Sequence, residues 1–278
     1  MNHQNSFYRS LSTIERQLWV NRILILIILV AIGGHFHDQA WHQNLFLEIN
    51  HSEILRLAPI DWGLITSLGE TFFLIFILLS VITLSPQSIR AIVIAAILGT
   101  LLSHGIKNFY DYPRPVAILE AQVTIIGTVL LNKSYVSGHT VTAFVGLGLI
   151  MQWLIPFKGQ SVIKFLLLVL TCGIALSRIV VGAHWPLDIL IGALVGLMAA
   201  YIATPIANRL EHVSLNYFLF LLFALVIYSF YYCLFYDHVN TASGTLLGKW
   251  IAVIGLLVAL VFRKKDWLAL IFSSKISQ

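Results

Sequence analysis

Charged residues are scarce in this chain. Asp, Glu, Lys and Arg make up only 10% of its 278 residues, whereas roughly a quarter is usual for soluble domains. Hydrophobic residues make up 59%. The composition excludes an ordinary soluble domain and indicates a membrane protein. The chain also lacks an internal repeat, a low-complexity segment and a soluble domain.

Cysteine is nearly absent. Cys172 and Cys233 both lie in apolar stretches, so they imply neither a disulfide framework nor a metal site. Histidine is more common, but several histidines are scattered without the spacing or acidic partners of a metal site. These are His35, His37, His42 and His51. We expect no metal ion and no cofactor.

The apolar residues form blocks long enough to cross a membrane, which takes roughly 20 helical residues. We therefore predict an all-α fold, a polytopic transmembrane helix bundle. The eight predicted spans are approximately 17–36, 62–84, 89–106, 139–156, 162–182, 187–204, 216–236 and 247–262.

The distribution of charge predicts the orientation of the bundle better than the net charge of +5 does. Basic residues precede the first span, follow the last one and occupy alternate loops, while the other loops are acidic. By the positive-inside rule we expect both termini in the cytoplasm. We also expect the first span to be a retained helix, not a cleaved signal peptide. The loops expected to face outward are 37–61, 107–138, 183–186 and 237–246.

The first polar cluster, on the predicted outer side, follows the third span. It contains Lys107 and Arg114, and Arg114 stands between Pro113 and Pro115. Alone, Lys107 would be interpreted as an anchor that snorkels to the interface. The two prolines restrict the backbone around Arg114, however. Two fixed cations in one loop can bind an anion, the Arg by a bidentate fork and the Lys as a point charge.

The second cluster is Ser137-Gly138-His139, directly before the fourth span. Ser137 alone is explained as a helix N-cap. A helix start also offers free backbone N–H groups and a positive dipole end, which together bind anions. Gly138 allows a phosphate oxygen to approach the backbone closely. His139 can carry a proton at neutral pH and is a candidate acid.

The third cluster joins the fifth and sixth spans and contains Arg178, His184 and Asp188. Pro186 suits a first helical turn, so Asp188 falls in that turn and His184 just outside it. Asp188 alone could simply complement the helix dipole. The spacing also allows its carboxylate to hold the His184 ring, as the Asp does in a Ser-His-Asp triad. His184 is then a candidate nucleophile.

Together the three clusters resemble the signature of the type 2 phosphatidic acid phosphatase (PAP2) superfamily in order and spacing. The signature covers about residues 107–188, and the similar helical organisation extends from about 17 to 204. Val136 departs from the family, which usually has Pro there. A second departure is that two spans follow residue 204, whereas membrane members commonly have six. The resemblance implies a PAP2-like phosphatase core over 1–204 and an additional transmembrane hairpin with a cytoplasmic tail over 205–278.

The resemblance also implies the roles of the site residues. His184 would attack phosphorus and form a phosphohistidine, Asp188 would hold its ring, and His139 would protonate the leaving group. The implied substrate-binding residues are Lys107, Arg114, Ser137, Gly138 and Arg178.

The function implied by the resemblance is that of a metal-independent lipid phosphatase in a bacterial inner membrane, with its active site facing the periplasm or exterior. Its substrate would be undecaprenyl diphosphate, phosphatidylglycerophosphate, phosphatidic acid or a lipid A phosphate. No nucleic-acid partner is expected. Two alternatives stay open: a phosphotransferase that passes the phosphoryl group to another lipid, and a transporter that binds the phosphate without cleaving it.

Three further features lie outside the signature residues. Glu70 lies within a predicted span, where a carboxylate normally faces a polar interior. His104, one turn before Lys107, could pack or line the cleft. The loop 116–131 is unusually apolar, so we expect it to enter the outer leaflet and guide a lipid tail, with Ile125 and Ile126 as candidate contacts.

Overall fold

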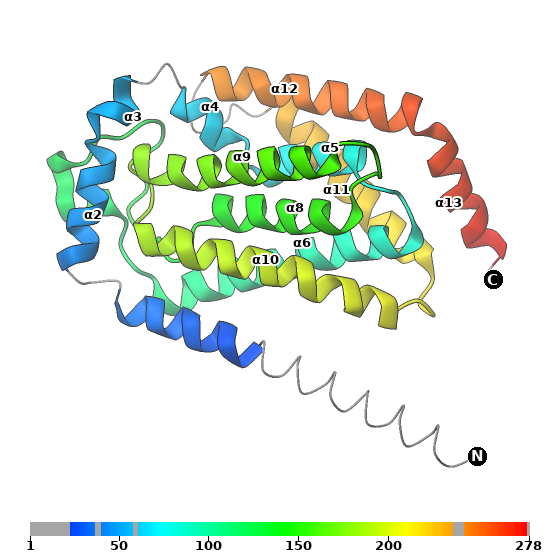
Figure 1. Ribbon diagram of the computed structural model, residues 1–278, viewed down its shortest axis with the longest axis horizontal. Coiled ribbons are helices and arrows are strands. Elements are labelled where there is room, and N and C mark those ends of the chain that lie inside the picture. Colours follow the sequence, from blue (N-terminus) through cyan, green and yellow to red (C-terminus); the bar gives the residue numbers. More distant parts are fainter. Residues whose placement is uncertain (1–22, 37–39, 58–60, 236–241, 277–278) are drawn as a thin grey trace, which may run out of the picture.

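The computed structural model describes residues 23–36, 40–57, 61–235 and 242–276, and these ranges are mainly helical (Figure 1). Their only β-type pairing is an isolated bridge between Ile82 and Leu154. The predicted all-α polytopic bundle is confirmed. An unlabelled helical segment covers 23–35. The labelled helices are α2 (Ala40–Asn50), α3 (Glu53–Leu57), α4 (Trp62–Ser67), α5 (Thr71–Val81), α6 (Pro86–Tyr110), α7 (Pro115–Leu119), η1 (Glu120–Gln122), α8 (Gly138–Trp153), α9 (Gln160–Val180), α10 (Pro186–Arg209), α11 (Leu215–Phe235), α12 (Ala242–Leu257), η2 (Val258–Phe262) and α13 (Lys264–Ile276).

Helices α6, α8 and α10 pack together at the centre of the bundle (Figure 1). Small residues on α10 allow the close approach, since a Cβ at Gly196 would lie 2.4 Å from the carbonyl oxygen of Val141 on α8. A Cβ at Gly192 would lie 3.1 Å from the carbonyl oxygen of Ser137. In a membrane, where lipid tails are as apolar as side chains, such backbone-to-backbone packing drives helix association. It also brings the first turns of α8 and α10 together.

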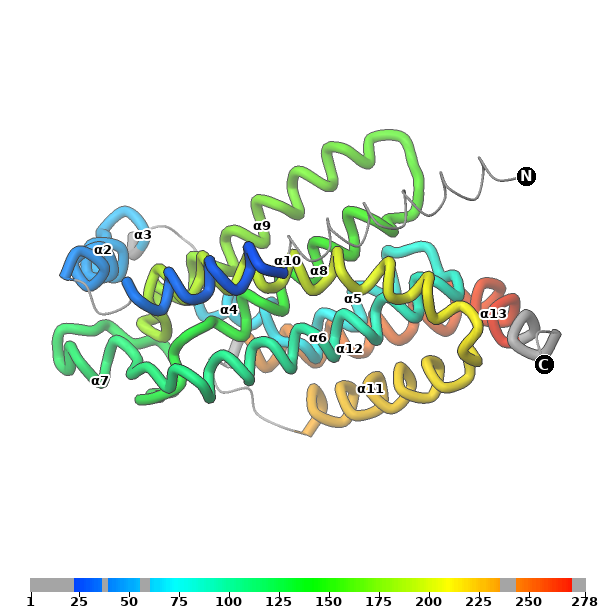
Figure 2. Tube along the Cα trace, turned by 90° about the horizontal axis from the view of Figure 1, so that it is seen from below, coloured from blue at the N-terminus to red at the C-terminus, as the bar shows by residue number. Residues whose placement is uncertain are grey.

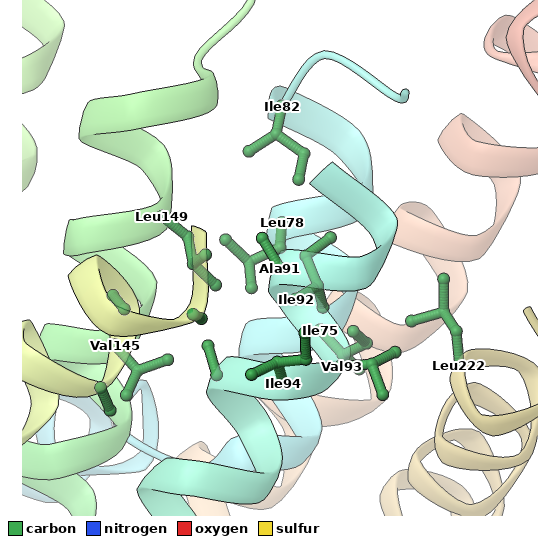
Figure 3. Packing of buried hydrophobic residues seen from close by; sticks show 14 of the residues in the cluster. Ile75, Leu78, Ile82, Ala91, Ile92, Val93, Ile94, Val145, Leu149 and Leu222 are labelled. Carbon is green, nitrogen blue, oxygen red and sulfur yellow. The ribbon is translucent and has the colours of Figure 1, made fainter. Parts of the chain in front are cut away.

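A second layer of packing joins α5 to α6, α8 and α11. Figure 3 shows the side chains of this buried cluster gathered between the helices. The labelled members are Ile75 and Leu78 of α5, Ile82 directly after α5, Ala91, Ile92, Val93 and Ile94 of α6, Val145 and Leu149 of α8, and Leu222 of α11.

Five helices in the described residues are long and apolar enough to cross a membrane, or six if a bent pair near the N-terminus is one span. This pair joins residues 23–35 to α2 at an angle of 86°. The predicted eight spans are therefore not all present as long helices. The predicted span 139–156 corresponds to α8, which has 16 residues and is largely buried. The start of the predicted span 17–36 and the loop at 236–241 lie outside the described residues.

The prediction of one continuous helix over 62–84 is wrong, because the chain breaks into α4 and α5 at residues 68–70. Asp61 caps α4 by accepting from the backbone N–H of Leu64 at 2.9 Å. Glu70, in extended conformation, is the N-cap residue of α5. Hydropathy alone could not predict the break, since apolar residues stand on both sides of it.

The C-terminal helices pack against the rest of the bundle. α11 and α12 both contact α5, and α12 also contacts α4. After α12, the buried Arg263 donates from Nη1 to the carbonyl oxygens of Leu79 and Ile82 at the end of α5. α10 continues through Pro205 to Arg209. The division at residue 204 stays a prediction.

Gly196→Ala tests the packing of α10 on α8. We expect a fall of several degrees in the melting temperature of the detergent-purified protein, because the added Cβ meets the α8 backbone and the helices must separate. Gly173→Ala is the matched control, since a Cβ there would meet no heavy atom of another described segment within 4 Å. The control should keep or raise the melting temperature, as Ala favours helix by up to about 1 kcal/mol over Gly. Equal melting temperatures for both variants would contradict the packing argument.

Candidate active site

The three polar clusters converge at one end of the bundle. The end of α6, the start of α8, the end of α9 and the start of α10 all lie there, beside α2 and α7 (Figures 1 and 2). The eight residues singled out from the sequence are brought together at this end. They are Lys107, Arg114, Ser137, Gly138, His139, Arg178, His184 and Asp188.

His184 and Asp188 form a buried pair at the start of α10. His184 Nδ1 lies 3.1 Å from Asp188 Oδ2, and the residues are 2% and 0% exposed. The same oxygen accepts from the backbone N–H of Trp185 at 2.9 Å and from the hydroxyl of Ser134 at 2.5 Å. A carboxylate bonded to Nδ1 leaves Nε2 as the unprotonated nitrogen of the neutral ring, which carries the lone pair.

Nε2 of His184 faces Arg114, whose Nη1 lies 3.3 Å away. Arg114 also donates to the carbonyl oxygens of Asn132 and Ala183, both at 3.0 Å. These bonds fix the guanidinium beside the imidazole. Burial, and secondarily the charge of Arg114, holds the pKa of His184 well below the ordinary value of 6.5. The ring is therefore neutral at physiological pH, as a nucleophile requires.

The first turn of α8 completes one wall of the site. Ser137 is the N-cap, and its hydroxyl accepts from the backbone N–H of Thr140. Its backbone N–H donates to the carbonyl oxygen of Asp188 at 3.0 Å, which joins the starts of α8 and α10. A Cβ at Gly138 would lie 4.0 Å from Cε of Lys107, so the Lys107 side chain lies beside the first residue of α8. The combination is a site for an anion.

Two polar contacts join the segment that contains α4 and α5 to the site. His139 Nε2 lies 3.0 Å from Glu70 Oε1, and Arg178 Nη1 donates to the hydroxyl of Thr66. Arg178 is 4% exposed, and its Nε has no hydrogen-bond partner among the described residues. A buried, unpartnered N–H on a cation is costly unless an anion occupies the site.

Several supporting residues escaped the sequence analysis. Ser134 reaches Asp188, and Trp185 donates from its indole to the carbonyl oxygen of Pro113 at 2.9 Å. The fully buried His42 accepts at Nε2 from the backbone N–H of Leu187 at 3.0 Å. The Asn50 amide donates to the carbonyl oxygens of Thr124, Ile179 and Val180. No local motif marks these residues, because each acts across more than fifty positions of sequence.

The apolar loop 116–131 is divided between two environments. Ile125 and Ile126 pack against buried clusters of the protein, so they are not the expected contacts for a lipid tail. Val129, Leu130 and Leu131 are instead about half exposed, at 54%, 47% and 54%. Their exposure fits contact with the membrane.

An apolar cavity of about 140 Å³ leads away from the site between α5, α6 and α8. Gly138, Ser103 and His104 border it at the site end, and Ile92, Leu149 and Leu225 border it deeper in the bundle. The hydroxyl of Ser103 is buried there without a hydrogen-bond partner among the described residues. The cavity is lined mainly by apolar atoms, as a pocket for a hydrocarbon chain would be.

Within the described residues, no group of three or more His, Cys, Asp or Glu side chains is arranged to hold a metal ion. The charged groups of the site are instead three cations and two carboxylates. These are Lys107, Arg114 and Arg178 with Glu70 and Asp188. The site therefore carries a net positive charge, which attracts an anionic phosphate group.

Comparisons with known proteins agree with this arrangement. The PAP2 superfamily model matches residues 88–212, which contain all eight site residues. An undecaprenyl-diphosphatase of Sulfolobus acidocaldarius is 25% identical over 203 residues, 68% of this chain and 91% of that protein. The bacitracin transport permease protein BcrC of Bacillus licheniformis is 30% identical over 129 residues, 45% of this chain and 57% of that protein.

Among solved structures, LpxE of Aquifex aeolicus is 28% identical, with a TM-score of 0.50, and the alignment covers 60% of this chain and 97% of that one. The similarity thus extends over nearly the whole length of two relatives and includes the complete three-part signature. The chain belongs to the PAP2 superfamily, and within it to the membrane-bound lipid phosphatases.

Proposed function

We propose that the protein hydrolyses a phosphomonoester or diphosphate of a lipid through a phosphohistidine on His184, without a metal ion. The observation that carries the proposal is the position of this ring. Asp188 holds Nδ1, and Nε2 points toward Arg114 beside the start of α8. This is the geometry of an activated nucleophile next to an anion site.

In the first step, Nε2 of His184 attacks phosphorus while the bond from phosphorus to the leaving oxygen breaks. His139 gives its proton to that oxygen, and the lipid alcohol or lipid monophosphate departs. Lys107, Arg114 and Arg178 stabilise the charge on the equatorial oxygens. Phosphoryl transfer depends mainly on positioning and on charge stabilisation of this kind.

In the second step, neutral His139 takes a proton from water, whose oxygen attacks phosphorus as the N–P bond breaks. Inorganic phosphate leaves and His184 is neutral again. A second lipid hydroxyl in place of water would make the protein a phosphotransferase. Both reactions would pass through the same phosphohistidine. Whether water or a lipid hydroxyl accepts the phosphoryl group determines which reaction the protein catalyses.

The cavity between α5, α6 and α8 supports a lipid as the substrate, because it connects an anion site to a hydrocarbon-like interior. Among the four candidate lipids, a polyprenyl diphosphate is favoured by the similarity to an undecaprenyl-diphosphatase. The charge pattern of the loops supports an active site on the periplasmic or exterior face of a bacterial inner membrane. A transporter would need no nucleophile paired with a carboxylate, so we favour the enzyme.

Phosphate release in EDTA is the direct test of this function. We expect the detergent-purified protein to release phosphate from at least one of the four candidate lipids with EDTA present. His184→Ala should reduce the rate by about 10³-fold or more, because the nucleophile is lost. Release abolished by EDTA, or retained in the variant, would contradict the mechanism. No release until an acceptor lipid is added would indicate the phosphotransferase.

Asp188→Asn tests the role of the carboxylate. An amide can donate to Nδ1 and so stabilise the tautomer that carries its proton on Nε2, which cannot attack. We expect kcat to fall by about 10²- to 10⁴-fold, as for the equivalent change in serine proteases. Ser134→Ala is the control, since it removes one hydrogen bond to the same oxygen but keeps the charge, and its effect should stay below about tenfold. Equal losses in both variants would count against a tautomer effect.

Ala96→Phe tests whether the cavity holds the lipid chain. Ala96 lines the cavity, and a phenyl ring there would fill part of it. We expect KM to rise by about tenfold or more for a long-chain lipid phosphate and to change little for a short, water-soluble one. Ile97→Phe on the same helix is the control, because Ile97 does not line the cavity and is 46% exposed. A similar change in KM for both chain lengths would argue against chain binding.

A further inference from the structure

The site contains two histidine–carboxylate pairs, and the three-part signature includes only one of them. Beside His184–Asp188, His139 Nε2 lies 3.0 Å from Oε1 of Glu70. Glu70 belongs to the turn between α4 and α5, well before the signature begins. We propose that Glu70 is a positioning residue that holds the His139 imidazole, and its proton, for transfer to the leaving group. This inference rests on the proposed phosphatase function.

The two pairs differ in exposure. The side chains of His184 and Asp188 are 2% and 0% exposed, whereas those of His139 and Glu70 are 21% and 19% exposed. A nucleophile must be shielded from competing proton donors. An acid must instead reach the departing alcohol and then the incoming water. The partial exposure of His139 and Glu70 suits the second task.

The backbone fixes the position of Glu70 relative to His139. A Cβ at Gly69 would lie 3.0 Å from Cβ of His139 and 2.9 Å from Cγ2 of Ile174, so the turn is packed directly against the histidine. Glu70 is the N-cap residue of α5, yet its side chain makes no capping hydrogen bond to that helix. A capping side chain normally accepts from the backbone of the first turn. Here the carboxylate is directed to the imidazole.

The negative charge of Glu70 also affects the protonation of the His139 ring. Arg178 and Lys107 are the other charged side chains that act on His139, and both are cations. Two nearby positive charges disfavour a protonated imidazole, and the Glu70 carboxylate offsets them. Removing this anion would therefore make the protonated form of His139, the acid of the first step, less favourable.

The bonding partners of the ring assign a role to each nitrogen. Nε2 donates to Glu70, and no protein group in the described residues hydrogen-bonds to Nδ1. In the first step, Nδ1–H of the protonated ring gives its proton to the leaving oxygen as the P–O bond breaks and the bond from phosphorus to His184 forms. In the second step, Nδ1 takes a proton from the attacking water. Glu70 keeps its hydrogen bond throughout and is not itself protonated.

Glu70→Gln separates this role from a structural one, because Gln keeps the size and the hydrogen-bonding oxygen but removes the charge. We would measure kcat on octyl phosphate, whose alkoxide leaving group needs a proton, and on para-nitrophenyl phosphate, whose leaving group does not. We expect kcat to fall by about 10- to 100-fold on octyl phosphate and by less than about threefold on para-nitrophenyl phosphate. The loss on octyl phosphate should be smaller than the full effect of general acid catalysis, because His139 itself is still present.

Three controls make the result decisive. His139→Ala should again lower kcat more on octyl phosphate than on para-nitrophenyl phosphate, and by a larger factor than Glu70→Gln. Glu48→Gln, on the exposed face of α2, should change neither rate. His184→Ala should abolish activity on both substrates. Equal losses of Glu70→Gln on the two substrates, or no loss on either, would overturn the positioning role while leaving the phosphatase function intact. Wild-type protein inactive on both substrates and on lipid phosphates would instead refute the function itself.

Discussion

One oxygen, Oδ2 of Asp188, organises the whole site. It accepts hydrogen bonds from a side chain before α8, from the backbone at the start of α10 and from the histidine we propose as nucleophile. Burying a carboxylate is costly unless donors surround it. The donors that this buried carboxylate requires come from the loop before α8, the turn after α9 and the first turn of α10. Their hydrogen bonds to it therefore hold these three segments together. The dense packing of α8 on α10 supplies the rigid base for that unit.

Around Asp188, positive charges outnumber negative ones. Three cations face two carboxylates, and both carboxylates are already bound to histidines. The cations are held by backbone carbonyls and a hydroxyl, which orient them without neutralising them. A phosphate group that binds here would supply negative charge to these cations. Such preorganised charge stabilises a transition state without reorganisation during the reaction.

Composition was enough to predict the helical class and the membrane setting, and the family resemblance of three short motifs between residues 107 and 188 implied that they form one site. These features depend on hydropathy and on local helix starts and ends, both of which are visible along the chain. The break between α4 and α5 was not predictable, because apolar residues surround it on both sides. The pairing of Glu70 with His139 and of Ser134 with Asp188 depends on how helices pack, which one sequence does not reveal. The site residues recognised in advance are those within short motifs, and those missed are single residues that reach across the bundle.

The helix α2 lies outside the central bundle yet holds the turn that carries His184. Asn50 binds the last carbonyls of α9, and His42 accepts from the backbone of Leu187 just past that turn. Proteins open locally in segments that cost much less free energy than global unfolding. Local opening of α2 would release the turn while the central helices stay folded. A detergent or bilayer that displaces this one helix would then inactivate the enzyme with little change in helix content.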